Sequence, residues 1–213
     1  MKRLALIPLV IAAAAVALFV MVVLKPSIRG TEFASVCCFL MLAAAAGPFL
    51  YRRDPRAAAL RCGALGVFAG VVTAVLSVTT SAGPIVVPFL AGAFCGLYAF
   101  AVGALGSLGG DLCRLAAATL GFVLLATLHV WDDVALLDAT DRKGSARLAF
   151  ALNPAAAASV TLDYDWIHAT ELYRDNETAE SLAGVPRAGL GLYSLKVAAV
   201  ALVAAALGWW KRR

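Results

Sequence analysis

Apolar positions form long runs along this chain, and short polar stretches separate the runs. Five runs are apolar over the roughly 20 residues that a helix needs to cross a hydrocarbon core about 30 Å thick, and a sixth closes the chain. The pattern predicts an all-α protein: a bundle of six transmembrane helices in one integral membrane domain, residues 1–213. The predicted spans are residues 4–24, 33–51, 57–78, 84–105, 112–131 and 190–210.

The first run follows "MKR" and has the outline of a secretory signal. We expect a membrane span there instead, because the run exceeds the roughly 7 to 15 apolar residues of a signal core and no small-x-small cleavage site follows it.

Composition supports the membrane class. Hydrophobic residues make up 62% of the chain and charged residues only 15%, with a mean hydropathy of +0.88. Soluble domains carry about 25% charged residues, so an ordinary soluble domain is excluded.

The basic residues predict the orientation. With six crossings, ten basic and two acidic residues fall on the side of both termini, against seven basic and eleven acidic residues on the other. Because short cytoplasmic loops are rich in Lys and Arg, we expect both termini to be cytoplasmic in a bacterial-type cytoplasmic membrane. The sequence pI of about 9.1 then needs no nucleic-acid partner.

Small residues mark expected helix contacts, since helices in lipid associate through close packing. Glycine pairs four residues apart occur at Gly66 and Gly70, at Gly92 and Gly96, and at Gly106 and Gly110. The five cysteines lie in or at the ends of spans without metal-type spacing, so we interpret them as small apolar packing residues.

The longest connection, residues 132–189, exceeds the usual 2 to 8 residues between helices and is expected to be extracytoplasmic. Asn153 and Pro154 break the chain there, and an alanine run restarts a helix. Beyond it, one helical face carries Leu162, Trp166, Ala169 and Tyr173, and another carries Asp165, His168, Glu171 and Asp175. The segment is therefore predicted to form a helical cap over the bundle.

A few residues of this cap are candidates for a gate or docking surface. They are Trp166, His168, Asp165, Glu171 and Tyr173, joined by Lys196 in the last span. The spacing of Asp165, His168 and Glu171 can seat a divalent cation, but a solvated acidic face is the favoured interpretation. Lys196 either snorkels toward the outer interface or faces the bundle, paired with an outer carboxylate.

No catalytic, cofactor or metal site stands out elsewhere. His129 is the only histidine in a span, whereas bis-histidine haem needs a second axial ligand, and no phosphate-binding glycine loop is present. We therefore expect no enzyme activity and no cofactor, and any ATP-driven work requires a separate ATPase.

Two stretches resemble a known family. "FCGLYAFAVGALGSLGGDLCRLAAATLGFVLLATLHVW" resembles the fourth and fifth spans of permease subunits of the type-2 class of ATP-binding-cassette exporters, and "ALNPAAAAS" resembles the Asn-Pro start of their outer helices. The likeness covers about residues 84–213 and is one of pattern. It implies six spans, cytoplasmic termini, short re-entrant helices between spans five and six, a cytoplasmic ATPase and an ATPase-coupling loop at Arg52, Arg53, Asp54 and Arg56.

The chain departs from that family in two places. Its first span begins after three residues, where such permeases carry an amphipathic helix, and "YRRDPR" is shorter than their coupling loop. The Gly-Pro and Gly-Asp pairs in "GPIVVPFLAGAF" and "GSLGGDL" also resemble those of substrate-binding components of energy-coupling-factor importers. The final outer loop of those proteins is shorter.

Three classes of function follow. The first is a transport subunit that dimerises and relies on a separate ATPase. The second is a non-catalytic accessory or assembly subunit that packs against other membrane subunits. The third is an interfacial membrane enzyme using His168 with Asp165.

Overall fold

The structure is a computed structural model that describes residues 28–51, 54–80, 86–130, 151–162 and 189–211. These residues form α-helices and contain no strand, which confirms the all-α class for the described part of the chain. The helices are α2 (Ile28–Leu50), α3 (Pro55–Thr80), α4 (Val86–Gly106), α5 (Asp111–Val130), α7 (Pro154–Thr161) and α11 (Leu190–Trp210).

Each predicted span from the second onward coincides with one long helix. Four of these helices are long and apolar enough to cross a membrane: Glu32–Leu50, Pro55–Leu76, Val86–Gly106 and Leu190–Trp210. The predicted crossing by α5 stays a prediction, and the predicted span at residues 4–24 lies outside the described residues. The chain thus has the build of an integral, multi-pass membrane protein.

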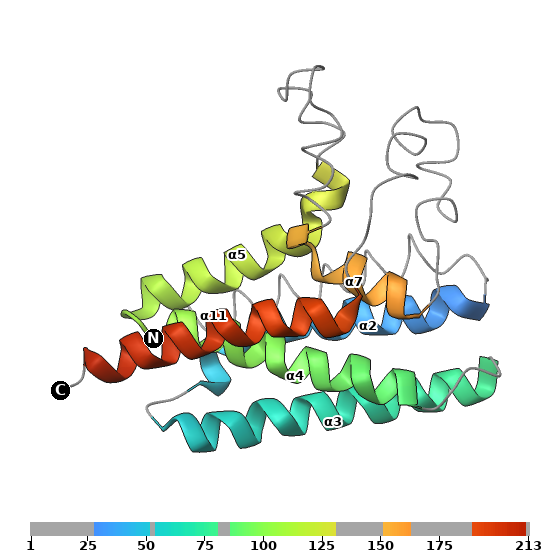
Figure 1. Ribbon diagram of the computed structural model, residues 1–213, viewed down its shortest axis with the longest axis horizontal. Coiled ribbons are helices and arrows are strands. Elements are labelled where there is room, and N and C mark those ends of the chain that lie inside the picture. The colour runs from blue at the N-terminus through green and yellow to red at the C-terminus, as the bar shows by residue number, and fades with distance from the viewer. Residues whose placement is uncertain (1–27, 52–53, 81–85, 131–150, 163–188, 212–213) are drawn as a thin grey trace.

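Helix α4 lies at the centre of the bundle, in contact with α2, α3, α5 and α11 (Figure 1). It has the most buried stretch of the four apolar helices, with 61% of its most apolar window inside the structure. Its core residues include Phe94, Tyr98 and Val102, which join the main apolar cluster. The other helices therefore pack around α4.

One end of the bundle carries Arg56, Arg61, Arg114 and Lys211, and we call it the basic end. The α2–α3 and α4–α5 connections and the last turn of α11 all lie there (Figure 1). Lys211 donates to the Leu108 carbonyl at 3.0 Å, Arg61 donates to the Leu50 carbonyl at 3.4 Å, and Arg114 pairs with Asp111 at 2.9 Å. Basic residues predicted to share one side of the membrane thus share one end of the bundle.

Glycines let α3 and α4 approach until their backbones touch. A Cβ added at Gly92 would lie 2.5 Å from the Gly66 carbonyl oxygen, and one added at Gly96 would lie 2.7 Å from the Cys62 carbonyl oxygen. A Cβ added at Gly70 would lie 3.2 Å from the Phe89 ring and 3.5 Å from the Pro88 carbonyl oxygen, a looser contact on the same face. The prediction that the Gly66/Gly70 and Gly92/Gly96 pairs mark contact faces is confirmed.

The third predicted pair is wrong in part. Gly106 packs against Pro48 and Arg114, but a Cβ at Gly110 would meet nothing within 4 Å among the described residues. Gly110 is exposed in the turn before α5, which explains why it marks no contact. A close approach that the glycine pairs did not predict joins α2 to α4, where a Cβ at Gly103 would lie 2.5 Å from the Gly47 carbonyl oxygen.

Most of the cysteines are buried, as expected for small apolar packing residues. Cys37, Cys62 and Cys95 are buried free thiols, and Cys38 is partly buried. Cys113 is the exception, since it is exposed in the first turn of α5.

Candidate functional site

Asn153 and Pro154 start a short helix inside the bundle. The Asn153 side-chain oxygen accepts hydrogen bonds from the amides of Ala155 at 2.7 Å and Ala156 at 3.2 Å, and Pro154 fills the first helical position. This is the usual chemistry of a helix N-terminus, where the first amides lack partners within the helix. The predicted Asn-Pro break followed by a helix is confirmed.

The same side chain ties α7 to α5. The Asn153 amide nitrogen donates to the Leu125 carbonyl at 3.0 Å, and the residue is fully buried. At the other end of α7, the Thr161 hydroxyl accepts from the Leu190 amide at 3.1 Å, which ties α7 to the start of α11. Helix α7 is therefore hydrogen-bonded to both long helices that flank it in sequence.

Alanines allow α7 to lie within the bundle. Ala155 to Ala158 are all buried, and α7 contacts α2, α5 and α11 at the end opposite the basic end (Figure 1). The described helix ends at Thr161 and is buried over most of its surface, because methyl side chains fit between the long helices. The predicted amphipathic face that begins at Leu162 continues outside the described residues, so it stays a prediction.

Beside α7 lies a pocket between α4, α5 and α11, with a volume of about 170 Å³. Its walls are almost entirely apolar. The residues that bear polar side-chain atoms are Tyr98, Tyr193 and Lys196, and Leu152 contributes to the wall just before Asn153. An apolar pocket with a few polar groups is the usual form of a small-molecule site.

Two tyrosines fix the walls of this pocket. The Tyr98 hydroxyl donates to the Gly121 carbonyl of α5 at 2.9 Å, and the Tyr193 hydroxyl donates to the Leu152 carbonyl. The Phe94 ring packs edge-on against the Tyr193 ring, with centroids 5.6 Å apart. Each wall is thus held by a bond between residues distant in sequence.

Lys196 is the basic residue in the wall of the pocket. It lies in the second turn of α11, roughly 9 Å along the axis from Leu190 at 1.5 Å per residue. Its side chain is exposed and also lines the pocket beside Tyr193 and Val197. The pocket can therefore hold an apolar body whose anionic or polar group faces the ammonium of Lys196.

We expect Tyr98→Phe to weaken the contact between α4 and α5 without emptying the pocket. The ring remains, and the loss of one interhelical hydrogen bond costs about 0.6 to 1 kcal/mol in a helical membrane protein. The melting temperature of the detergent-solubilised variant measures this loss. Lys196→Met is the matched control, since it changes an exposed pocket residue; a larger loss in Lys196→Met than in Tyr98→Phe would contradict the assignment.

The other predicted site residues divide into two groups. Trp166, His168, Asp165, Glu171 and Tyr173, together with Arg52 and Arg53, lie outside the described residues. Asp54 and Arg56 are described, and the Asp54 carboxylate accepts from the Arg56 amide at 2.9 Å, so Asp54 caps α3. Within the described ranges, no cluster of three or more potential metal ligands occurs.

Sequence reasoning missed Tyr98 as a site residue. Its signal is a phenol in the middle of the apolar run "FCGLYAF", where a polar aromatic residue needs a hydrogen-bond partner. The sequence predicts the Asn153-Pro154 break and helix start but not the bond from Asn153 to α5, although a buried amide side chain requires partners.

Comparison with protein-family models, curated proteins and solved structures finds no match to this chain. The fold and the pocket alone therefore define the class of protein. The described residues form a helical bundle built like a multi-pass membrane protein. The bundle contains a short buried helix, and it also contains an apolar pocket with one lysine in its wall.

Proposed function

We propose that this chain is the membrane-embedded subunit of a transporter, of the kind found in ATP-binding-cassette exporters that use a separate ATPase. The observation that carries the proposal is α7, a short helix that begins at Asn153 and lies inside the bundle between α5 and α11 in sequence. In the permeases that the chain resembles, short re-entrant helices occupy this place. The buried Asn-Pro start supports the likeness at the level of structure.

The proposed topology has six crossings with the basic end in the cytoplasm. The clustering of Arg56, Arg61, Arg114 and Lys211 at one end supports this orientation, because cytoplasmic ends retain Lys and Arg. Residues 132–189 then form the extracytoplasmic cap of a bacterial-type cytoplasmic membrane protein, and α7 is the part of the cap that enters the bundle.

In this proposal the pocket beside α7 contacts the substrate and the coupling loop contacts the ATPase. Lys196 favours an amphipathic substrate with an anionic group, since the rest of the wall is apolar. Asp54 caps the first turn of α3 and also belongs to the proposed coupling loop. A movement of this loop is therefore passed directly to α3. The chain itself performs no catalysis.

Affinity purification of the tagged chain from its native membranes tests the proposal. We expect an ATP-binding-cassette ATPase to co-purify and Arg53→Glu to reduce its recovery about tenfold, since reversing one charge at a contact costs on the order of 1 to 2 kcal/mol. Lys211→Glu, a charge reversal at the same end outside the loop, is the control. Repeated purifications without any such ATPase would refute the proposal.

A second candidate is a non-catalytic accessory subunit of a larger membrane complex. Helix α11 favours it, because only 28% of its most apolar window is buried within the structure. Large apolar side chains remain exposed there, including Leu192, Leu195, Leu202, Val203 and Trp210. A stable, monodisperse monomer isolated without partners would argue against this candidate.

A further inference from the structure

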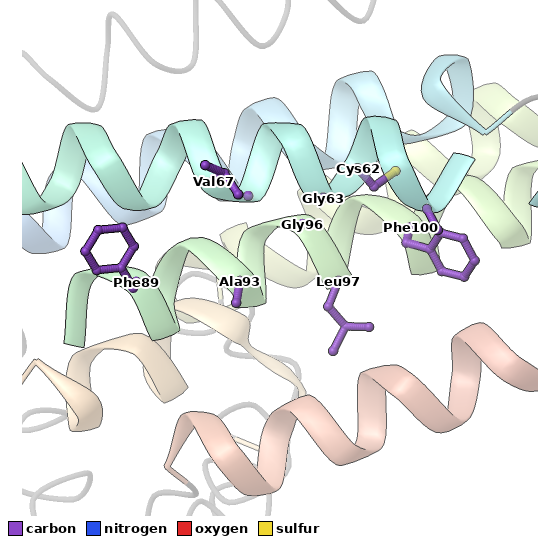
Figure 2. Close-up of a pocket in the computed structure, with 10 residues that line it drawn as sticks. Cys62, Gly63, Val67, Phe89, Ala93, Gly96, Leu97 and Phe100 are labelled. Carbon is purple, nitrogen blue, oxygen red and sulfur yellow. The ribbon is translucent and has the colours of Figure 1, made fainter. Parts of the chain in front are cut away.

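A second hollow, separate from the pocket beside α7, runs along the outer face of α3 and α4 (Figure 2). This groove has a volume of about 500 Å³. Its α3 side runs from Ala59 to Val67, and its α4 side runs from Phe89 to Phe100. Phe89 and Phe100 stand at opposite ends of the groove, and Gly63, between them, has no side chain to fill it (Figure 2).

The groove is long enough to hold much of an acyl chain. From Phe89 to Phe100 the α4 axis advances roughly 16 Å at 1.5 Å per residue, about half of a 30 Å hydrocarbon core. All α3 residues that line it, from Ala59 to Val67, belong to the first half of that helix, which begins at the basic end. The groove therefore runs from the second turn of α3, near the basic end, to the first turn of α4, at the other end of that helix.

Arg56 is a basic residue near the end of the groove that lies closest to the basic end. Arg56, Ala59 and Gly63 are spaced i, i+3 and i+7 on α3, so they share one helical face. Arg56 is exposed within one turn of the groove's end. The described acids at this end are already engaged: Asp54 accepts from a backbone amide, and Asp111 pairs with Arg114.

We propose that this groove binds an anionic phospholipid, with an acyl chain between α3 and α4 and the phosphate at Arg56. The apolar wall suits hydrocarbon, and the guanidinium suits a phosphate at headgroup level. This inference is independent of the proposed transport function.

Native mass spectrometry of the full chain tests the proposal, after equilibration with phosphatidylglycerol and phosphatidylcholine of identical acyl chains. We expect the wild type to retain phosphatidylglycerol preferentially. Arg56→Gln should reduce that preference about fivefold and leave phosphatidylcholine retention unchanged. Gly63→Leu should reduce bound lipid about tenfold, as expected when about two methylenes are kept out of the groove.

The chain offers a matched control. A Cβ at Gly63 meets nothing within 4 Å, so leucine fills the groove without striking the bundle, and the same holds for Gly191 on α11. Gly191→Leu should therefore leave lipid retention unchanged. If Gly63→Leu lowers the melting temperature, Ala93→Leu fills the groove from α4 instead.

Equal retention of the two lipids by the wild type would overturn the proposal. Unchanged retention in both groove-filling variants would do so as well. A change of oligomeric state in Gly63→Leu with unaltered lipid binding would assign the groove to a second copy of the chain and would also overturn it.

Discussion

Gly92→Ala is expected to destabilise the bundle by about 3 kcal/mol, at the upper end of the cost of overpacking a well-packed interior. The added methyl would lie 2.5 Å from both the Gly66 carbonyl oxygen and the Gly70 Cα, and it would also overlap the Gly70 amide nitrogen. All of these atoms belong to the backbone of α3, so a rotamer change cannot relieve the contact. Thermal unfolding of the detergent-solubilised protein, followed by size-exclusion chromatography, measures the effect.

Gly63→Ala is the control for this substitution, because it also places alanine in a helix that contacts α4. Its Cβ meets nothing within 4 Å, so we expect a neutral or slightly stabilising effect of up to about 1 kcal/mol, the helix-propensity gain of alanine over glycine. Equal melting temperatures for the two variants would contradict the close approach of α3 and α4.

Asn153→Ala is expected to cost about 3 kcal/mol. The substitution leaves the buried amides of Ala155 and Ala156 without their acceptor, which costs about 1 to 3 kcal/mol. It also removes the hydrogen bond to the Leu125 carbonyl of α5, which costs about 0.6 to 1 kcal/mol. We expect α7 to detach from the bundle. Faster proteolysis between α5 and α11, measured at a temperature where the wild type is folded, reports that detachment.

Asn153→Ser separates the two roles of this side chain. Serine keeps an oxygen that can cap α7, but it lacks the amide that reaches Leu125. We therefore expect the stability of Asn153→Ser to lie between that of the wild type and that of Asn153→Ala. If serine and alanine have the same effect, the cap contributes nothing measurable to the docking of α7.

The helices were predictable because their signal is local. Twenty consecutive apolar residues specify a membrane helix wherever they occur, and the bounds of α4 and α11 agree closely with the predicted spans 84–105 and 190–210. The start of α7 was equally predictable, since Asn followed by Pro supplies both a cap and a first helical residue.

The pocket was not predictable by the same reasoning, because it depends on residues that meet only after folding. The Tyr98 hydroxyl reaches a carbonyl 23 residues away, and the Tyr193 hydroxyl reaches one 41 residues away. Lys196 was singled out from the sequence because a charge at membrane depth is conspicuous, yet its position beside two tyrosines required the packing of α4 against α11. The approach of Gly103 to Gly47 was not predicted, because the small residue one turn before Gly103 is Ala99 and no pair of glycines four residues apart marks the position.

The bond between the Thr161 hydroxyl and the Leu190 amide also has a consequence for the evolution of the chain. It joins the end of α7 to the start of α11. A substitution that removes the Thr161 hydroxyl acts on both helix ends at once, so these two positions are constrained together.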